Sequence, residues 1–152
     1  MSKFLSEGKI LHCKAVAEIM YNIALNCCGY EEDIAEEMYA LGFVHDIGYN
    51  HIDESEHHGF KSAAMLPGYR YSGELLYHGD ASQRFYSEYI KILNFADMHV
   101  LSDGSIVSMS TRLDDIRERY GAKSRQVEDA EVIAETAYPS SWYVLMKNQY
   151  GV

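Results

Sequence analysis

Four residues of this chain carry side chains that commonly bind metal ions: His12, His45, Asp46 and Asp97. Three of them continue helical stripes that are otherwise mostly apolar, and Asp46 directly follows His45. A carboxylate in such a place needs a partner, because desolvating its charge costs several kcal/mol. Coordination of a cation is one of the few interactions that compensate this cost. Two imidazoles and two carboxylates form a mixed nitrogen and oxygen ligand set, which suits manganese, iron or zinc better than copper or calcium.

Each of these residues also has an ordinary structural explanation. A lone histidine on an apolar stripe is usually a hydrogen-bonded core residue, an HD dipeptide is common by chance, and Asp97 could be the buried partner of an arginine. The prediction of a metal site therefore depends on all four residues occurring in order on separate helices. Adjacent residues of a helix point about 100° apart. His45 and Asp46 can thus reach one ion only near a helix end, which Gly48 supplies.

Apolar periodicity predicts that most of the chain is helical. Helices are expected over residues 7–28, 31–47, 56–66, 72–77, 82–99, 111–120, 126–137 and 142–148. In the fifth of these, the apolar stripe consists of Tyr86, Ile90, Leu93 and Asp97. Residues 104–108 could hold a few extended residues. No internal repeat or long linker divides the 152 residues, so they predict one all-α domain, a single helical bundle.

The composition restricts the classes of partner. Acidic residues outnumber basic ones by 23 to 13, which gives a formal net charge of −10. Such a surface argues against binding a long nucleic acid, which requires lysine and arginine. A small phosphorylated partner remains compatible, because a metal ion reverses the local sign of the charge. Three cysteines are too few for a disulfide scaffold. No apolar run approaches the roughly 18 residues of a membrane span, so we expect a cytoplasmic protein that does not cross a membrane.

The ordered pattern of these four residues resembles the HD-domain superfamily of metal-dependent phosphohydrolases over about residues 8–121. HHGFKSAAML, which contains His58, resembles the stretch that supplies an additional histidine in a small bacterial subgroup. LLYHGD, which contains His78, resembles the next such stretch. NFADMHVLSDGSIVSMSTRLDDIRERYG is similar to the subgroup's extended segment after the final aspartate. The resemblance implies a single HD-type domain over residues 1–152, with the helices of residues 126–150 packed on it.

The resemblance also implies roles for single residues. The four residues named first would bind one ion, and His45 and Asp46 would be catalytic. In binuclear members of the family, His58 and His78 help to bind a second ion, which Asp46 bridges to the first. His57 competes with His58 for this place, and we prefer His58 because it directly precedes Gly59, as in the resembling stretch. One or two divalent ions are therefore expected as cofactors, and the presence of both histidines favours two.

Three basic residues are candidates to hold a substrate phosphate: Lys61, Arg70 and Arg112. Arginine offers a planar fork of donors for this purpose, although a solvated surface position is the commoner role of each. The chain departs from the wider family at two positions. Met98 and Tyr49 stand where many or some members carry lysine, and both changes remove a positive charge that could hold a phosphate.

The activity implied by the resemblance is hydrolysis of a phosphate ester or anhydride in a small molecule, such as a nucleotide, by metal-activated water. Two alternatives remain open. A di-iron oxygenase could use the same ligands, and a non-catalytic regulatory module could bind a ligand without turnover. Hydrolysis is favoured over oxygenation through family frequency alone, and the module would be favoured by missing ligands, whereas this chain retains them all. The oligomeric state is also open, with a homo-oligomer among the options.

Overall fold

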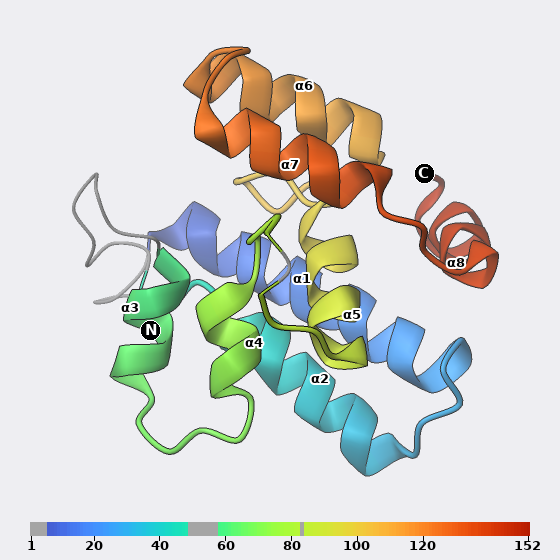
Figure 1. The fold of residues 1–152 in the computed structure, drawn as a ribbon. Helices are drawn as coiled ribbons and strands as arrows, with labels where there is room; N and C mark the ends of the chain where they lie inside the picture. Colours follow the sequence, from blue (N-terminus) through green and yellow to red (C-terminus); the bar gives the residue numbers. More distant parts are fainter. Residues whose placement is uncertain (1–5, 49–57, 83) are drawn as a thin grey trace.

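The computed structural model describes residues 6–48, 58–82 and 84–152 (Figure 1). Within these ranges the chain is helical without a β-sheet, which confirms the predicted all-α class. The helices described are α1 (Glu7–Asn26), α2 (Glu32–Val44), α3 (His58–Met65), α4 (Ser72–Tyr77), α5 (Glu88–Asp97), α6 (Met109–Tyr120), α7 (Arg125–Glu135) and α8 (Ser140–Tyr150). None of them is long and apolar enough to cross a membrane.

Helices α1 and α2 share the most extensive contact between the described elements. The two backbones approach each other at Gly42, where an added Cβ would lie 2.7 Å from the Cα atom of Ala17. A residue with a side chain would collide with the backbone of α1, so glycine is required at this crossing. The close approach brings the C-terminal end of α2 beside the middle of α1.

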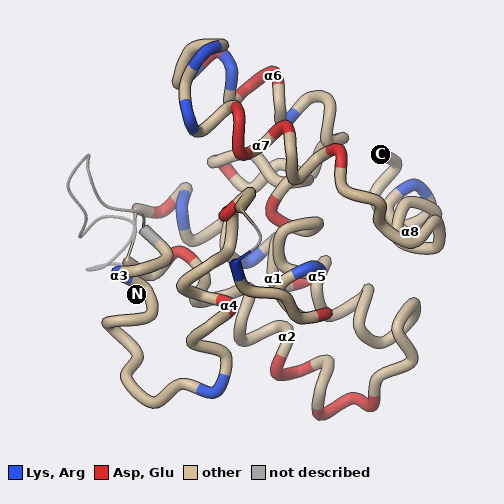
Figure 2. The backbone as a smooth tube through the Cα atoms, viewed as in Figure 1, with Lys and Arg blue, Asp and Glu red and all other residues tan. Residues whose placement is uncertain are grey.

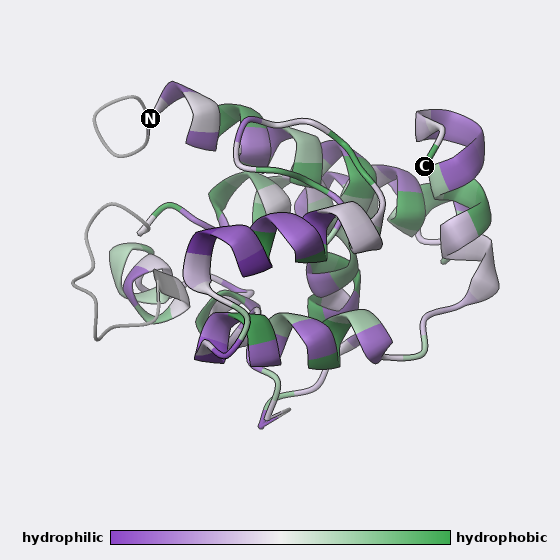
Figure 3. Ribbon diagram, turned by 90° about the horizontal axis from the view of Figure 1, so that it is seen from above, coloured by the Kyte–Doolittle hydropathy of each residue, from purple (hydrophilic) through white to green (hydrophobic). Residues whose placement is uncertain are grey.

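The main core lies between α1, α2, α4, α5 and α8. Helix α1 contributes a fully buried stripe that includes Val16, Ile19 and Ile23. Helix α8 closes one side of this core, since Trp142 packs edge-on against Phe95 of α5 with 5.3 Å between ring centroids. Figure 3 shows that the helices carry hydrophilic residues on one side and hydrophobic residues on the other, as amphipathic helices around a core do.

Helices α6 and α7 lie side by side (Figure 1) and cover a second, smaller core cluster. Its buried members are Met98, Ile116, Val127, Ala130 and Ile133. Acidic side chains gather elsewhere, on the first half of α2 (Figure 2). There they face the positive end of the helix dipole, which stabilises the helix start.

Some expected boundaries differ from the structure. The fifth helix begins at Glu88 rather than near residue 82, because Ser87 caps it and its Oγ accepts a hydrogen bond from the Ile90 N–H at 3.0 Å. Tyr86 therefore precedes the helix and is 74% exposed instead of belonging to its apolar stripe. The expected extended residues near 104–108 are reduced to one antiparallel bridge between Val100 and Ile106.

Candidate metal centre

The structure brings together the four residues that the sequence singled out. His12 lies in the middle of α1, His45 and Asp46 follow the last residue of α2, and Asp97 ends α5. One potential ligand atom from each residue lies within 4.8 Å of the others. Both histidines are fully buried and Asp46 is 2% exposed. This buried cluster, here called the His/Asp centre, could hold a metal ion.

The end of α2 explains how two adjacent residues reach one point. The helix stops at Val44, three residues earlier than expected, so His45 and Asp46 lie in a turn rather than on the helix. The turn is held against α3, because the Gly48 N–H donates a hydrogen bond to Ser62 Oγ at 2.9 Å. A Cβ on Gly48 would lie 2.5 Å from the backbone nitrogen of Ser62, so glycine is needed for this contact as well.

Hydrogen bonds to the backbone set the orientation of the imidazole rings. At and beside the centre, Nδ1 of each described imidazole donates to a carbonyl oxygen: His12 to Leu101 at 3.0 Å, His45 to Gly42 at 2.6 Å and His78 to Leu75 at 2.7 Å. A carbonyl oxygen can only accept, so the ring proton must be on Nδ1. In a neutral ring, Nε2 then presents its lone pair, so a carbonyl oxygen that accepts from Nδ1 prepares the histidine for metal binding.

These Nε2 atoms face carboxylate oxygens, which are also acceptors. His12 Nε2 lies 2.9 Å from Asp97 Oδ1 and 3.5 Å from Asp46 Oδ2. His45 Nε2 lies 3.2 Å from Asp46 Oδ2 and 3.5 Å from Asp97 Oδ1. Among the described residues, His45 Nε2 has no hydrogen-bond partner of acceptable geometry, although it is buried. Acceptors that converge in this way need a proton or a cation between them, and the donor set fits a divalent ion.

The charges of the centre shift two pKa values in opposite directions. Burial by itself lowers the pKa of His45, but the negative charge of Asp46 outweighs it and holds that pKa well above its usual range. Burial raises the pKa of Asp97, but the hydrogen bond with His12 and the nearby His45 imidazole outweigh it and hold the pKa well below its usual range. Without an ion, the centre therefore retains a proton, which a metal ion would displace.

Of the two histidines expected at a second ion, the structure describes the side chain of His78 but not that of His58. His78 is buried at the end of α4, and its Nε2 lies 3.4 Å from Asp46 Oδ1. This is the carboxylate oxygen opposite to the one that faces His12 and His45, as a bridging role of Asp46 requires. His58 begins α3, but its side chain and all of His57 lie outside the described residues.

Lys9 contacts the His/Asp centre through Asp46, although it was not among the residues expected there. Its Nζ lies 2.9 Å from Asp46 Oδ2, and its side chain is 13% exposed. Lys9 precedes His12 by three residues, a spacing that puts two side chains on the same face of a helix. This spacing was the feature of the sequence that could have identified Lys9. The lysine supplies one positive charge to a centre that contains two carboxylates.

The three basic residues expected to hold a phosphate lie in different surroundings. Arg70 Nη1 pairs with Glu37 Oε1 at 2.8 Å and is largely exposed. Glu37 precedes His45 by eight residues, or about 12 Å along a helix axis, so the structure does not bring Arg70 to the centre. Arg112 pairs with Asp115 within α6 at 3.4 Å. Lys61 is half-buried in α3, whose backbone packs against the turn after the centre.

Comparison with known proteins adds no relative: no family model, curated protein or solved structure matches the chain.

Proposed function

We propose that the protein is a metal-dependent phosphohydrolase of the HD-domain type that acts on a small phosphorylated molecule. The observation that carries this proposal is the buried convergence of imidazole Nε2 atoms and carboxylate oxygens in the His/Asp centre. The order of the ligands along the chain and the all-α fold support the HD type. The net charge of −10 favours a small substrate over a long nucleic acid.

One divalent ion, of manganese, iron or zinc, would be held by His12, His45, Asp46 and Asp97. The position of His78 at the other oxygen of Asp46 supports a second ion beside it. When bound, such ions lower the pKa of coordinated water and neutralise charge that develops on phosphoryl oxygens.

The chain's own residues orient the reaction. The carbonyl oxygens of Leu101 and Gly42 accept hydrogen bonds from Nδ1 of His12 and His45 and so fix both rings. The Nε2 atoms are therefore already oriented when a cation binds. The side chain of Asp97 is 23% exposed, whereas the other three members of the centre are at most 3% exposed. Water and substrate therefore approach the centre from the side of Asp97.

Phosphate release tests the proposal. Protein loaded with manganese, iron or zinc would be incubated with a panel of phosphate monoesters and anhydrides. We expect turnover of at least one class and a loss of at least about 100-fold in Asp46→Asn. Asp114→Asn is the matched control, because Asp114 is exposed and pairs with Arg117 on α6.

Two results would contradict the proposal. If no metal-loaded form releases phosphate, or if Asp46→Asn releases it at the wild-type rate, the His/Asp centre does not catalyse hydrolysis. Oxygen consumption by the iron form in the absence of phosphate release would favour the oxygenase alternative.

A further inference from the structure

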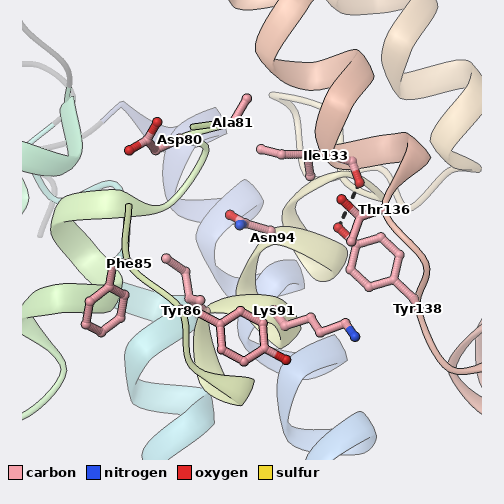
Figure 4. A pocket seen from close by; sticks show the side chains of 10 residues that line it. Asp80, Ala81, Phe85, Tyr86, Lys91, Asn94, Ile133, Thr136 and Tyr138 are labelled. Atoms are coloured by element: carbon pink, nitrogen blue, oxygen red, sulfur yellow. Dashed lines mark hydrogen bonds between the residues drawn. The ribbon is translucent and has the colours of Figure 1, made fainter. Parts of the chain in front are cut away.

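A pocket of about 110 Å³ lies between residues 80–81 and 85–86, α5 and the end of α7 (Figure 4). A cavity of about 150 Å³ binds benzene, so this partly open pocket has room for at most one flat ring. Pockets that enclose a whole drug-sized ligand are usually about 300 Å³ or more, so this one would take part of a larger molecule.

The pocket adjoins the His/Asp centre through two segments. Asn94, which lines it, precedes Asp97 by three residues and lies on the same side of α5. The Asn94 Oδ1 atom accepts a hydrogen bond from the Gly79 N–H at 2.9 Å. Gly79 directly follows His78, whose Nε2 faces Asp46. Residues 78–80 and 94–97 therefore contribute both to the centre and to the pocket, which are about one helical turn apart along α5.

The walls of the pocket suit a flat ring. Tyr86 and Tyr138 present aromatic side chains to it (Figure 4), whereas the ring of Phe85 stacks on Tyr77. The Tyr138 hydroxyl donates to the Ile133 carbonyl oxygen at 2.9 Å, so this group is already occupied. Lys91 Nζ lies 5.9 Å from the centre of the Tyr138 ring. Aromatic faces of this kind stabilise a stacked planar ring.

Two of the polar side chains that line the pocket, Asn94 and Lys91, are available to donate N–H groups. The oxygens of Asp80 already accept hydrogen bonds from Ser82 and from Arg84. The amide nitrogen of Asn94 has no hydrogen-bond partner in the described part of the chain. Together with the Lys91 ammonium, it offers N–H groups to an acceptor. A ring that carries carbonyl oxygens matches this arrangement.

We propose that this pocket, here called the α5 pocket, is the subsite for the organic part of the substrate, a planar ring that bears carbonyl acceptors. The inference rests on the proposed function for the phosphate end of that substrate. In such a molecule the phosphate would lie at an ion held by the His/Asp centre and the ring beside Asn94 and Lys91.

Uridine is a suitable probe, because it has a planar ring with two carbonyl groups and no phosphate. It would be titrated into the full-length ¹⁵N-labelled protein while backbone amide signals and the Asn94 side-chain signal are followed by NMR. We expect saturable shifts at Asn94 and Lys91, and at least fivefold weaker binding to Tyr86→Ala. Tyr86 is 74% exposed, so this substitution removes a wall of the pocket with little effect on folding.

Tyr120→Ala is the matched control, since Tyr120 is also exposed and lies on α6 outside the pocket. Shifts that do not saturate at millimolar uridine, or equal affinity of the Tyr86→Ala and Tyr120→Ala variants, would contradict the proposal that the α5 pocket binds the ring. The titration involves neither phosphate nor turnover. Binding of uridine without phosphatase activity would thus preserve the pocket and reject the hydrolase, and the reverse pair of results would do the opposite.

Discussion

At the residue scale, the protonation of His45 determines how the centre responds to pH. The raised pKa of His45 in the metal-free protein stabilises the fold fully below about pH 6.5, the unfolded value. This stabilisation is lost as the pH rises through the raised pKa. The lowered pKa of Asp97 acts with the opposite sign: its contribution is present above about pH 3.9 and is lost as the pH falls through the lowered value. In the metal-free protein, His45 and Asp97 together therefore stabilise the fold most between about pH 3.9 and about pH 6.5.

A bound metal ion reverses the loss of stability that His45 causes as the pH rises, because the ion must displace the proton of His45. We expect the difference in unfolding free energy between manganese-saturated and EDTA-treated protein to grow from pH 6 to pH 8. Urea unfolding at several pH values measures both forms. A difference that stays constant or shrinks with rising pH would mean that the ion does not compete with the proton at His45.

Lys9 offers a second prediction at this scale. The Lys9→Met substitution removes the ammonium group that lies 2.9 Å from Asp46 Oδ2. Because Asp46 is buried, we expect the metal-free protein to lose about 1–3 kcal/mol of stability. The loss should shrink when manganese is bound, since the ion replaces the missing positive charge. Lys9→Arg, which keeps the charge, is the control. An equal loss with and without manganese would show that Lys9 acts through packing instead.

At the scale of elements, the junction of α1 and α2 positions the centre. An added methyl group at Gly42 would meet the backbone of Ala17 at 2.7 Å, and the Gly42 carbonyl oxygen also holds His45 Nδ1. We expect Gly42→Ala to lower stability by roughly 1–3 kcal/mol through overpacking and to weaken metal binding as His45 moves. Thermal unfolding and metal titration measure the two effects.

Gly8→Ala is the matched control for that substitution. Gly8 lies in the first turn of α1, where an added Cβ would meet Ser102 O at an ordinary 3.4 Å. Alanine is the better helix former by up to about 1 kcal/mol, so this variant should be neutral or more stable. Normal metal binding by Gly42→Ala would indicate that the helix contact does not position His45.

The helices themselves could largely be predicted from the sequence, because their apolar stripes have the helical period. The start of α5 could not, since Tyr86 continues the spacing of Ile90 and Leu93 while the cap at Ser87 excludes it from the helix. The end of α2 at Val44 was equally hidden, because the apolar pattern continues through Ile47.

At the scale of the whole molecule, the residues of the His/Asp centre come from three distant parts of the chain. His12 and Asp97 are 85 residues apart, yet their side chains meet at 2.9 Å. The sequence identified them because polar side chains on apolar stripes are unusual. The spacing of Lys9 and His12 placed both on one face of α1, but the contact of Lys9 with Asp46 depends on how the helices pack. The same holds for the pocket that the segment around Asp80 borders with α7.

Elemental analysis of the purified protein tests the metal centre most directly. The protein would be purified without chelators or a metal-binding tag, and then incubated with iron, manganese or zinc. We predict at least one equivalent per chain in the wild type, with two equivalents if His78 and a further ligand hold a second ion. Asp97→Asn should retain little metal, whereas Asp114→Asn should retain the wild-type content. No bound metal in the wild type under any of these conditions, or full metal content in Asp97→Asn, would contradict the assignment of the His/Asp centre.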